Sequence, residues 1–136
     1  MEYNKRPRHA RQGVQMSVKR ILTVDDSGSV RALVSQALRS AGYDVVEAVD
    51  GADALDKVGS DVDMVITDVN MPNMGGLELL ARLRGREDTR FVPVLVLTTE
   101  SQRDKRELAI KSGATGWIVK PFRPEGLVAL VRRFLR

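Results

Sequence analysis

The segment VDMVITDVNMPNMGG (residues 62–76) runs from a strand pattern into a loop that cannot be helical. Its apolar run, Met64 to Ile66, leads after one threonine to a single acid, Asp68. Pro72 fixes its own φ and biases the residue before it away from helix, and the paired glycines permit a tight turn. The segment therefore predicts a buried strand that ends in a carboxylate and is followed directly by a loop into a helix.

The same alternation of strand and helix patterns continues on both sides of this segment. Short runs rich in Val, Ile and Leu alternate with stretches whose apolar residues recur at helical spacing. The expected strands are residues 20–24, 44–49, 62–67, 92–99 and 115–120, and the expected helices are residues 29–42, 51–60, 76–85, 101–113 and 124–136. Near-continuous apolar strands are typical of a parallel sheet covered on both faces. We therefore expect an α/β fold with a single doubly wound, five-stranded parallel sheet of flavodoxin-like type, in strand order 2-1-3-4-5.

The expected helix at residues 101–113 differs from the others because it is mostly polar. Leu108 and Ile110 are its expected core anchors. A helix with so few apolar contacts is loosely held, so it can move at little cost.

Bulk composition limits the classes of protein that need be considered. The 136 residues, 43% hydrophobic, fit one domain with a single good core. Cysteine is absent, which excludes disulfides, a thiol nucleophile and a thiolate metal site. No stretch approaches the roughly 20 apolar residues of a membrane span, and the basic start has no apolar run behind it. A cytoplasmic protein is therefore expected.

The net charge of +4 lies mostly at the start of the chain, where residues 1–17 carry four basic side chains against one acid. We expect residues 1–17 to be a basic, disordered extension and residues 18–136 to form the domain. Two alternatives stay open. The extension attracts nucleic acid or anionic lipid, or Met16 is the natural start of the protein.

Polar side chains stand where the expected strands end. Asp25 and Asp26 follow the first strand, Asp68 follows the third, Thr98 ends the fourth and Lys120 ends the fifth. Ligands of doubly wound sheets bind outside the carboxyl ends of the strands, at the switch point between strands 1 and 3. We therefore expect three acids, a hydroxyl and a lysine to converge on one edge of the sheet.

Three carboxylates in one place repel one another and so need a cation. Oxygen ligands without His or Cys favour Mg²⁺ or Ca²⁺, and Mg²⁺ is usually held by one or two carboxylates together with water and phosphate oxygens. Asp25, Asp26 and Asp68 leave coordination positions open, and Asn70 lies close enough to offer its backbone carbonyl. The expected cofactor is Mg²⁺.

Lys120 and Thr98 complete a site suited to phosphoryl transfer, in which Asp68 acts as the nucleophile. Each feature also has a plainer interpretation. Lys120 is then a counter-ion of the acids, Asp26 or Ser27 is a helix N-cap, and the loop after Asp68 is an ordinary strand-to-helix connection. The combination at matching strand ends favours the functional interpretation.

Four segments carry a resemblance to a known family: VDDSGSVR, ITDVNMPNMGGLELL, VLVLTTES and GATGWIVKPF. In this order they are similar to the receiver domain of two-component response regulators, especially the stand-alone chemotaxis regulators of the CheY type. The resemblance covers about residues 19–136 and implies a CheY-like fold.

The resemblance implies that Asp68 is the phosphoacceptor. It also implies that Asp26 and Asp68 ligate Mg²⁺ directly with the Asn70 carbonyl, while Asp25 acts mainly through water. On this basis the protein is not an enzyme with an external substrate; it catalyses its own Mg²⁺-dependent phosphorylation and dephosphorylation. Asn70 and Glu100 would flank the path of the hydrolytic water and set its rate.

The resemblance also implies a switch. Thr98 would hydrogen-bond the phosphoryl group, and Lys120 would form an ion pair with it. The Lys120–Pro121 peptide bond would be cis. Trp117 stands where the family usually has a Tyr or Phe switch residue. Gly75 replaces a common Asp in the family pattern. The readout face would be formed by the fourth helix, fifth strand and fifth helix.

The expected partners are a histidine kinase, which donates the phosphoryl group, and a downstream protein such as a flagellar motor switch protein. The chain itself is expected to be a monomer. An alternative is a phosphotransfer intermediate or a kinase-modulating receiver. A phosphatase of the haloacid dehalogenase type would need an acid where Asn70 stands. A flavodoxin-like nucleotide-binding module would need a phosphate loop rich in Ser, Thr and Gly after the first strand, where residues 25–27 are DDS. A DNA-binding output is not expected, because no helix-turn-helix segment follows the last helix.

Overall fold

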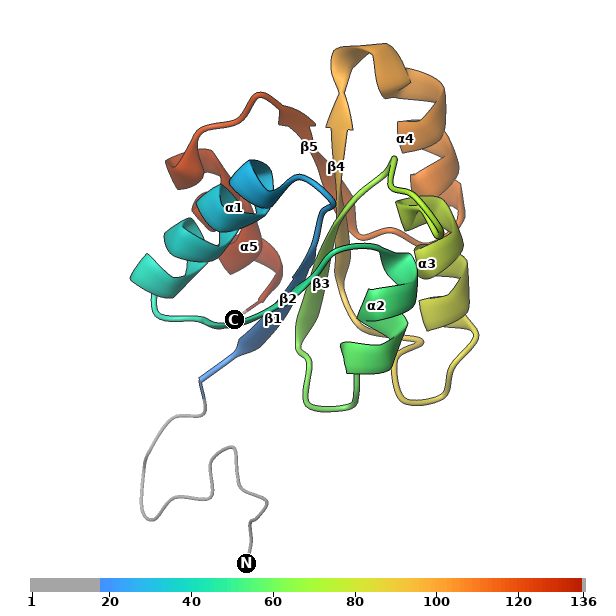
Figure 1. Ribbon diagram of the computed structural model, residues 1–136, viewed down its shortest axis with the longest axis horizontal. Helices are drawn as coiled ribbons and strands as arrows, with labels where there is room; N and C mark the ends of the chain where they lie inside the picture. The colour runs from blue at the N-terminus through green and yellow to red at the C-terminus, as the bar shows by residue number, and fades with distance from the viewer. Residues whose placement is uncertain (1–17, 136) are drawn as a thin grey trace, which may run out of the picture.

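The computed structural model describes residues 18–135 (Figure 1). The basic extension expected at residues 1–17 lies outside them, so its disorder stays a prediction. Within the described residues, strands and helices alternate along the chain as the sequence pattern predicts.

All five strands form one parallel sheet in the order β2-β1-β3-β4-β5, which confirms the predicted fold class. The strands are β1 (Arg20–Val24), β2 (Asp44–Ala48), β3 (Met64–Asp68), β4 (Val94–Thr99) and β5 (Gly116–Lys120). The helices are α1 (Gly28–Ser40), α2 (Gly51–Lys57), α3 (Gly76–Arg84), α4 (Arg103–Lys111) and α5 (Pro124–Phe134), with a short 3₁₀ helix, η2 (Glu100–Gln102), before α4.

The sheet is a central layer between two layers of helices. Figure 1 shows α1 and α5 on one face and α2, α3 and α4 on the other. Neighbouring strand residues serve opposite cores, because side chains alternate across a strand. Ile21 and Met64 pack in the core under α1 and α5, whereas Leu22 and Val65 pack in the core under the other three helices. This two-sided burial explains why the strands read as almost continuous apolar runs.

Local signals in the sequence account for the ends of α1. The Ser27 side chain caps the helix by accepting a hydrogen bond from the Val30 amide at 3.3 Å. The chain leaves the helix through Gly42, whose φ of 98° lies in the left-handed region that favours glycine. Among residues 18–135, no helix is both long enough and apolar enough to cross a bilayer.

The prediction that Leu108 and Ile110 anchor the fourth helix, α4, in the core is wrong. The side chain of Ala109 is fully buried, whereas Leu108 is 51% exposed and Ile110 is 39% exposed. Successive helical residues point about 100° apart, so only one of these three neighbours can face the sheet. The helix rests on a methyl group, and its larger apolar side chains remain at the surface.

Candidate functional site

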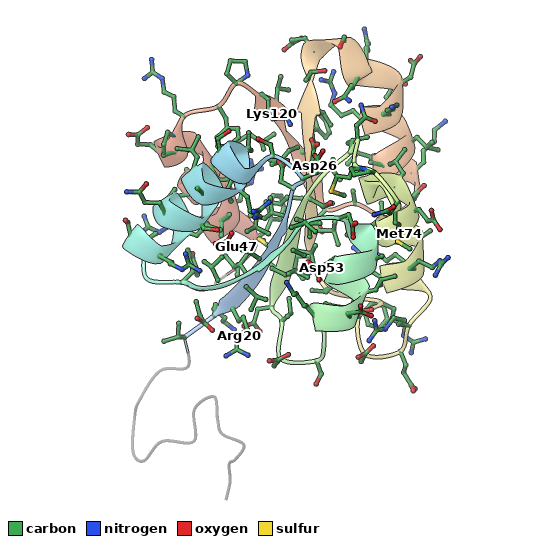
Figure 2. The ribbon with its side chains drawn as sticks, in the orientation of Figure 1. Arg20, Asp26, Glu47, Asp53, Met74 and Lys120 are labelled. Atoms are coloured by element: carbon green, nitrogen blue, oxygen red, sulfur yellow. The ribbon has the colours of Figure 1, made fainter. Side chains whose placement is uncertain are left out.

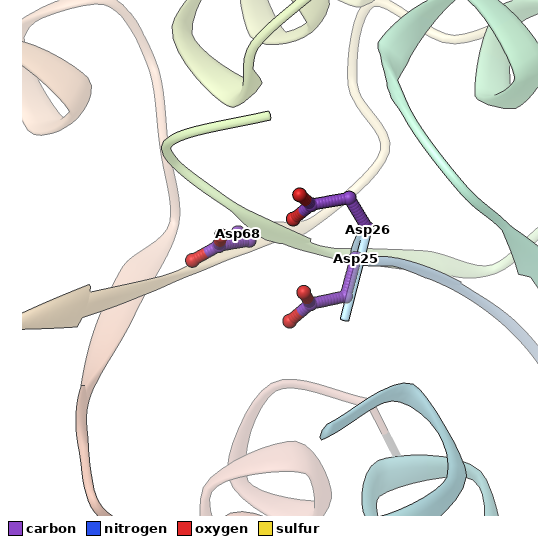
Figure 3. A group of neighbouring side chains, drawn as sticks. All are labelled: Asp25, Asp26 and Asp68. Carbon is purple, nitrogen blue, oxygen red and sulfur yellow. The ribbon is translucent and has the colours of Figure 1, made fainter. Parts of the chain in front are cut away.

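Strand register brings the acids of β1 and β3 together. Val24 of β1 pairs with Thr67 of β3, so the chain positions that follow, Asp25 and Asp68, lie at the same edge of the sheet. Oxygen atoms of the Asp25, Asp26 and Asp68 carboxylates all lie within 4.8 Å of one another (Figure 3). The predicted convergence of the three acids is therefore present in the structure.

Asp25 is the most deeply buried of the three, with only 1% of its surface exposed. The Ser27 amide donates a hydrogen bond to Asp25 Oδ1 at 2.9 Å, but within the described part of the chain Asp25 Oδ2 has no partner. Burial raises the pKa of the Asp25 carboxyl, and the nearby Asp68 charge raises it further. A buried acid with one unpaired oxygen is suited to a site that takes up a cation.

Asp26 is exposed, and it does not cap α1, since Ser27 takes that role. Its carboxylate is therefore available to a ligand. It lines a shallow pocket of about 390 Å³ together with Asn70, Met71 and Pro72 of the loop after β3. The outer side of the acidic cluster is thus open to a small ligand.

Lys120 reaches the acidic cluster from β5. Its Nζ lies 2.8 Å from Asp68 Oδ1, and the side chains of Lys120 and Asp68 are 24% and 9% exposed. Figure 2 shows Lys120 and Asp26 at the same end of the sheet. The Lys120–Pro121 peptide bond is cis, as the family resemblance implies.

Thr98 is the last residue but one of β4, which lies between β3 and β5. Leu97 pairs with Asp68, and Thr98 itself pairs with Val119, the residue before Lys120. The Thr98 hydroxyl is fully buried and, among residues 18–135, has no hydrogen-bond partner. A buried hydroxyl without a partner is costly unless a ligand satisfies it, so its placement suits an anion that arrives at Asp68.

The loop after Asp68 leaves no room for side chains where it turns into α3. A Cβ atom at Gly76 would lie 2.1 Å from the Asp68 carbonyl oxygen, and one at Gly75 would lie 2.9 Å from the Val69 carbonyl oxygen. Any side chain at position 75, including the Asp common in the family, requires this loop to shift. Two consecutive glycines therefore fit the close approach of the loop to the end of β3.

Asn73 and Asp50 hold the same loop from the side of α2, an arrangement that sequence reasoning missed. Asn73 has a φ of 64°, and its Nδ2 donates to Asp50 Oδ2 at 2.8 Å. Asp50 also caps α2 by accepting from the Asp53 amide at 2.8 Å. These hydrogen bonds lower the pKa of the Asp50 carboxyl, the bond from the Asp53 amide most strongly.

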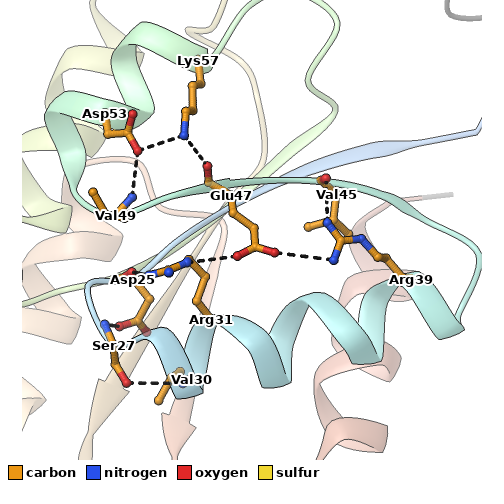
Figure 4. Close-up of polar contacts among 10 residues, drawn as sticks. All are labelled: Asp25, Ser27, Val30, Arg31, Arg39, Val45, Glu47, Val49, Asp53 and Lys57. Atoms are coloured by element: carbon orange, nitrogen blue, oxygen red, sulfur yellow. Dashed lines mark hydrogen bonds and ion pairs between the residues drawn. The ribbon is translucent and has the colours of Figure 1, made fainter.

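A second group that sequence reasoning missed surrounds the turn between β1 and α1 (Figure 4). Arg31 Nη1 donates to the Asp25 carbonyl oxygen at 2.7 Å, and Arg31 Nε donates to Glu47 Oε1 at 3.0 Å. Arg31 thus fixes the backbone that carries Asp25. The sequence holds no signal for this bond, because Arg31 and Glu47 meet only after β1 and β2 have paired.

The residues expected to tune or read out the site occupy different positions. The Asn70 side chain accepts a hydrogen bond from Lys105 Nζ at 2.6 Å, and exposed Glu100 begins η2 just after β4. Trp117 on β5 is 43% exposed, and the Arg106 guanidinium lies 5.4 Å from its ring centre. The ring is therefore outside the core, and the functional roles of these residues stay predictions.

The donor set fits a small hard cation. The site offers three carboxylates with mixed burial, an unpaired oxygen on Asp25 and no His or Cys. Asp25, Asp26 and Asp68 would hold a divalent ion such as Mg²⁺, which supplies positive charge to neutralise an incoming anion. Lys120 supplies a further positive charge directly at Asp68.

Comparisons with known proteins agree on one family. A sequence model described as the response regulator receiver domain matches residues 21–132. Chemotaxis protein CheY1 of Helicobacter pylori is 38% identical over 111 residues, which cover 79% of this chain and 90% of that protein. The solved structure of the chemotaxis response regulator CheY4 of Vibrio cholerae has a TM-score of 0.81 at 43% identity, covering 88% of this chain and 100% of that chain.

Similarity to the chemotaxis proteins does not by itself distinguish a chemotaxis role. Response regulator MprA of Mycobacterium tuberculosis is 43% identical over 122 residues, which cover 89% of this chain and 52% of that protein. A relative with a different name is thus at least as similar in sequence as CheY1. The matched residues run from β1 into α5 and so include every acid of the cluster, Thr98 and Lys120.

Proposed function

The chain belongs to the response regulator receiver domain family, and on this premise we propose that Asp68 accepts a phosphoryl group from a histidine kinase in a chemotaxis phosphorelay. Receiver domains pair with histidine kinases, and they are phosphoacceptors rather than enzymes with an external substrate. The observation that carries the proposal is the contact of Lys120 Nζ with Asp68 Oδ1 at 2.8 Å beside two further acids.

Asp68 is the acceptor because, among residues 18–135, it alone of the three acids forms an ion pair with a cationic side chain. An Asp68 carboxylate oxygen attacks phosphorus, and the bond between phosphorus and the histidine nitrogen of the kinase breaks. The electron pair of that bond returns to the histidine ring. Lys120 then pairs with a phosphoryl oxygen, and the buried Thr98 hydroxyl donates to another.

Asp25, Asp26 and Asp68, with the Asn70 backbone carbonyl, are the proposed Mg²⁺ ligands. When bound, Mg²⁺ offsets negative charge on the phosphoryl oxygens. Asp25, whose carboxylate is almost fully buried, would act mainly through a water molecule. The same groups make the chain the catalyst of its own phosphorylation and dephosphorylation.

The proposed output is a change at the face formed by α4, β5 and α5. Recruitment of the Thr98 hydroxyl to the phosphoryl group draws the end of β4 inward, and Trp117, two strand positions before Val119, can follow. The half-exposed ring and the few buried contacts of α4 support a movement of this kind.

Chemotaxis is the finer part of the proposal. It is supported by the likeness to CheY1 over 90% of that protein and to CheY4 over the whole of that chain. The proposed downstream partner is a flagellar motor switch protein that binds the phosphorylated form in the cytoplasm. The test is expression in a chemotactic bacterium that lacks its own regulator of this type. Restored reversals of flagellar rotation that require Asp68 support the chemotaxis role. Failure to restore them, although the chain is phosphorylated in the cell, contradicts that role.

The test of phosphoryl acceptance uses Trp117, the one tryptophan of the chain, as a reporter. Wild type, Asp68→Asn and the control Asp56→Asn are titrated with beryllofluoride in the presence and absence of Mg²⁺. Asp56 is an exposed acid on α2, away from the cluster. We expect a Mg²⁺-dependent fluorescence change in wild type and Asp56→Asn that Asp68→Asn lacks. A change of equal size in Asp68→Asn contradicts the proposal.

A further inference from the structure

Lys105 connects α4 to the loop that follows the phosphoryl-accepting strand. Its Nζ donates a hydrogen bond to Asn70 Oδ1 at 2.6 Å, and 35 residues separate the two in the sequence. Figure 1 shows the loop after β3 rising beside α4 at the carboxyl end of the sheet. The contact therefore spans the rim of the site, two residues beyond Asp68.

Lys105 differs in this respect from the neighbouring long side chains of α4. Arg103 pairs within the helix, with Glu107 at 3.3 Å, and Arg106 lies over the Trp117 ring on the opposite flank. Among the described residues, the bond to Asn70 is the contact that Lys105 makes with its charged end. The lysine is thus directed at the site rather than at its own helix.

We propose that Lys105 is a positioning residue that prolongs the phosphorylated state by occupying the side-chain oxygen of Asn70. This inference rests on the proposed function of Asp68. It adds a residue from α4 to Asn70 and Glu100, the residues that the family resemblance implies for the control of dephosphorylation.

The chemistry of hydrolysis explains the direction of the effect. The oxygen of a water molecule bonds to phosphorus, and the bond between phosphorus and the Asp68 oxygen breaks. Its electron pair returns to the Asp68 carboxylate, inorganic phosphate leaves, and the proton of the water passes to phosphate or solvent. Attack requires that the water be oriented, and Asn70 Oδ1 is an acceptor at the rim that can do so.

A lysine already bonded to that oxygen competes with the water. Asn70 and Asp26 both line the shallow pocket next to the acidic cluster, so water that approaches from this side meets the Asn70 amide. With Lys105 in place, one acceptor direction of Asn70 Oδ1 is taken and the amide is held toward α4. Loss of Lys105 frees the oxygen to orient water and speeds hydrolysis.

The experiment measures how fast the phosphorylated chain loses its phosphate. Each variant is loaded with acetyl phosphate and Mg²⁺, the donor is removed, and phosphate release is followed in a single turnover. The variants are Lys105→Met, which removes the donor, Lys105→Arg, which keeps one, and the control Lys111→Met. Lys111 is exposed on the same helix and makes no described contact with the loop. The first and third changes are repeated in an Asn70→Ala background.

We expect Lys105→Met to shorten the lifetime about fivefold, the effect of removing one competing hydrogen bond. Lys105→Arg and Lys111→Met keep a lifetime close to wild type, and in the Asn70→Ala background Lys105→Met has no further effect. A merely structural role of Lys105 would not depend on Asn70.

Two results overturn the inference while leaving the proposed function intact. One is an unchanged or longer lifetime in Lys105→Met. The other is an equal shortening in the presence and absence of the Asn70 side chain, which would mean that the ammonium charge acts without the amide. Failure of wild type to take phosphate on Asp68 overturns both the proposed function and this inference.

Discussion

Gly76 is the position where the site tolerates a side chain least. A Cβ atom there would lie 2.1 Å from the Asp68 carbonyl oxygen, a distance that only a shift of the backbone can relieve. We predict that Gly76→Ala lowers the free energy of unfolding by about 2 kcal/mol or more and impairs phosphorylation, because the strain falls on the backbone of Asp68. The measurement is chemical denaturation together with the beryllofluoride titration.

Gly126 provides the matched control for this substitution. It lies in the first turn of α5, and a Cβ atom there would meet nothing within 4 Å. Gly126→Ala should therefore be neutral or stabilise the protein by up to about 1 kcal/mol. Equal effects of the two substitutions would show that the close approach of Gly76 to Asp68 is not a constraint.

Asp50 gives a prediction about pH at the same scale. Hydrogen bonds from the Asp53 amide and the Asn73 side chain lower the pKa of the Asp50 carboxyl in the folded protein. Its ionised form therefore contributes stability that is present above the ordinary carboxyl pKa of about 3.9 and is lost as pH falls through the lowered value. Asp50→Asn keeps a capping oxygen but not the charge.

The measurement is the difference in free energy of unfolding between wild type and Asp50→Asn across pH. Wild type should be the more stable at neutral pH, and the difference should shrink below about pH 4. Asp56→Asn, which changes an exposed acid on the same helix, controls for net charge. A difference that stays constant down to the lowest pH would contradict the lowered pKa.

Among the elements, α4 is the one least tied to the core. Its buried residue is Ala109, whereas α3 buries Leu79, Leu80 and Leu83. We predict that native-state hydrogen exchange is faster in the amides of α4 than in those of α3, since local opening exposes little apolar surface. Exchange in α4 as slow as in α3 would argue against α4 as the moving part of the switch.

The order and type of the elements could be predicted because strand and helix periods alternate cleanly and the strand ends carry distinctive polar residues. Finer features could not. Leu108 and Ile110 are larger and more apolar than Ala109, yet the orientation of α4 decides which of them is buried. A helix whose hydrophobic pattern is weak gives little sequence signal for its orientation.

At the site, the residues at strand ends could be predicted and the side chains that support them could not. The carboxyl ends of parallel strands must meet at one edge, so the convergence of Asp25, Asp68 and Lys120 follows from topology. The bonds from Lys105 to Asn70 and from Arg31 to Glu47 instead depend on how long side chains cross between elements. Sequence spacing carries no information about such contacts.

At the scale of the whole molecule, the fold separates the apolar cores from the charged groups of the site, which lie at one edge of the sheet. One apolar core packs on each face of the sheet, and the mutually repelling carboxylates of Asp25, Asp26 and Asp68 lie at the edge formed by the carboxyl ends of the strands. The rigid sheet fixes Asp68 beside Lys120, while α4 buries a single residue and the Trp117 side chain on β5 is partly exposed. A rigid sheet beside the loosely held helix α4 is suited to converting phosphorylation of Asp68 into a change at the surface that binds a partner.

The central claim is that Asp68, and no other acid, receives the phosphoryl group. The most direct measurement treats the chain with acetyl phosphate and Mg²⁺, reduces any acyl phosphate with borohydride to homoserine, and locates the reduced residue by peptide mass spectrometry. We expect homoserine at position 68 alone, none without Mg²⁺, and none in Asp68→Asn. Homoserine at Asp25 or Asp26 in the wild-type chain, or no reduced residue at all, would contradict it.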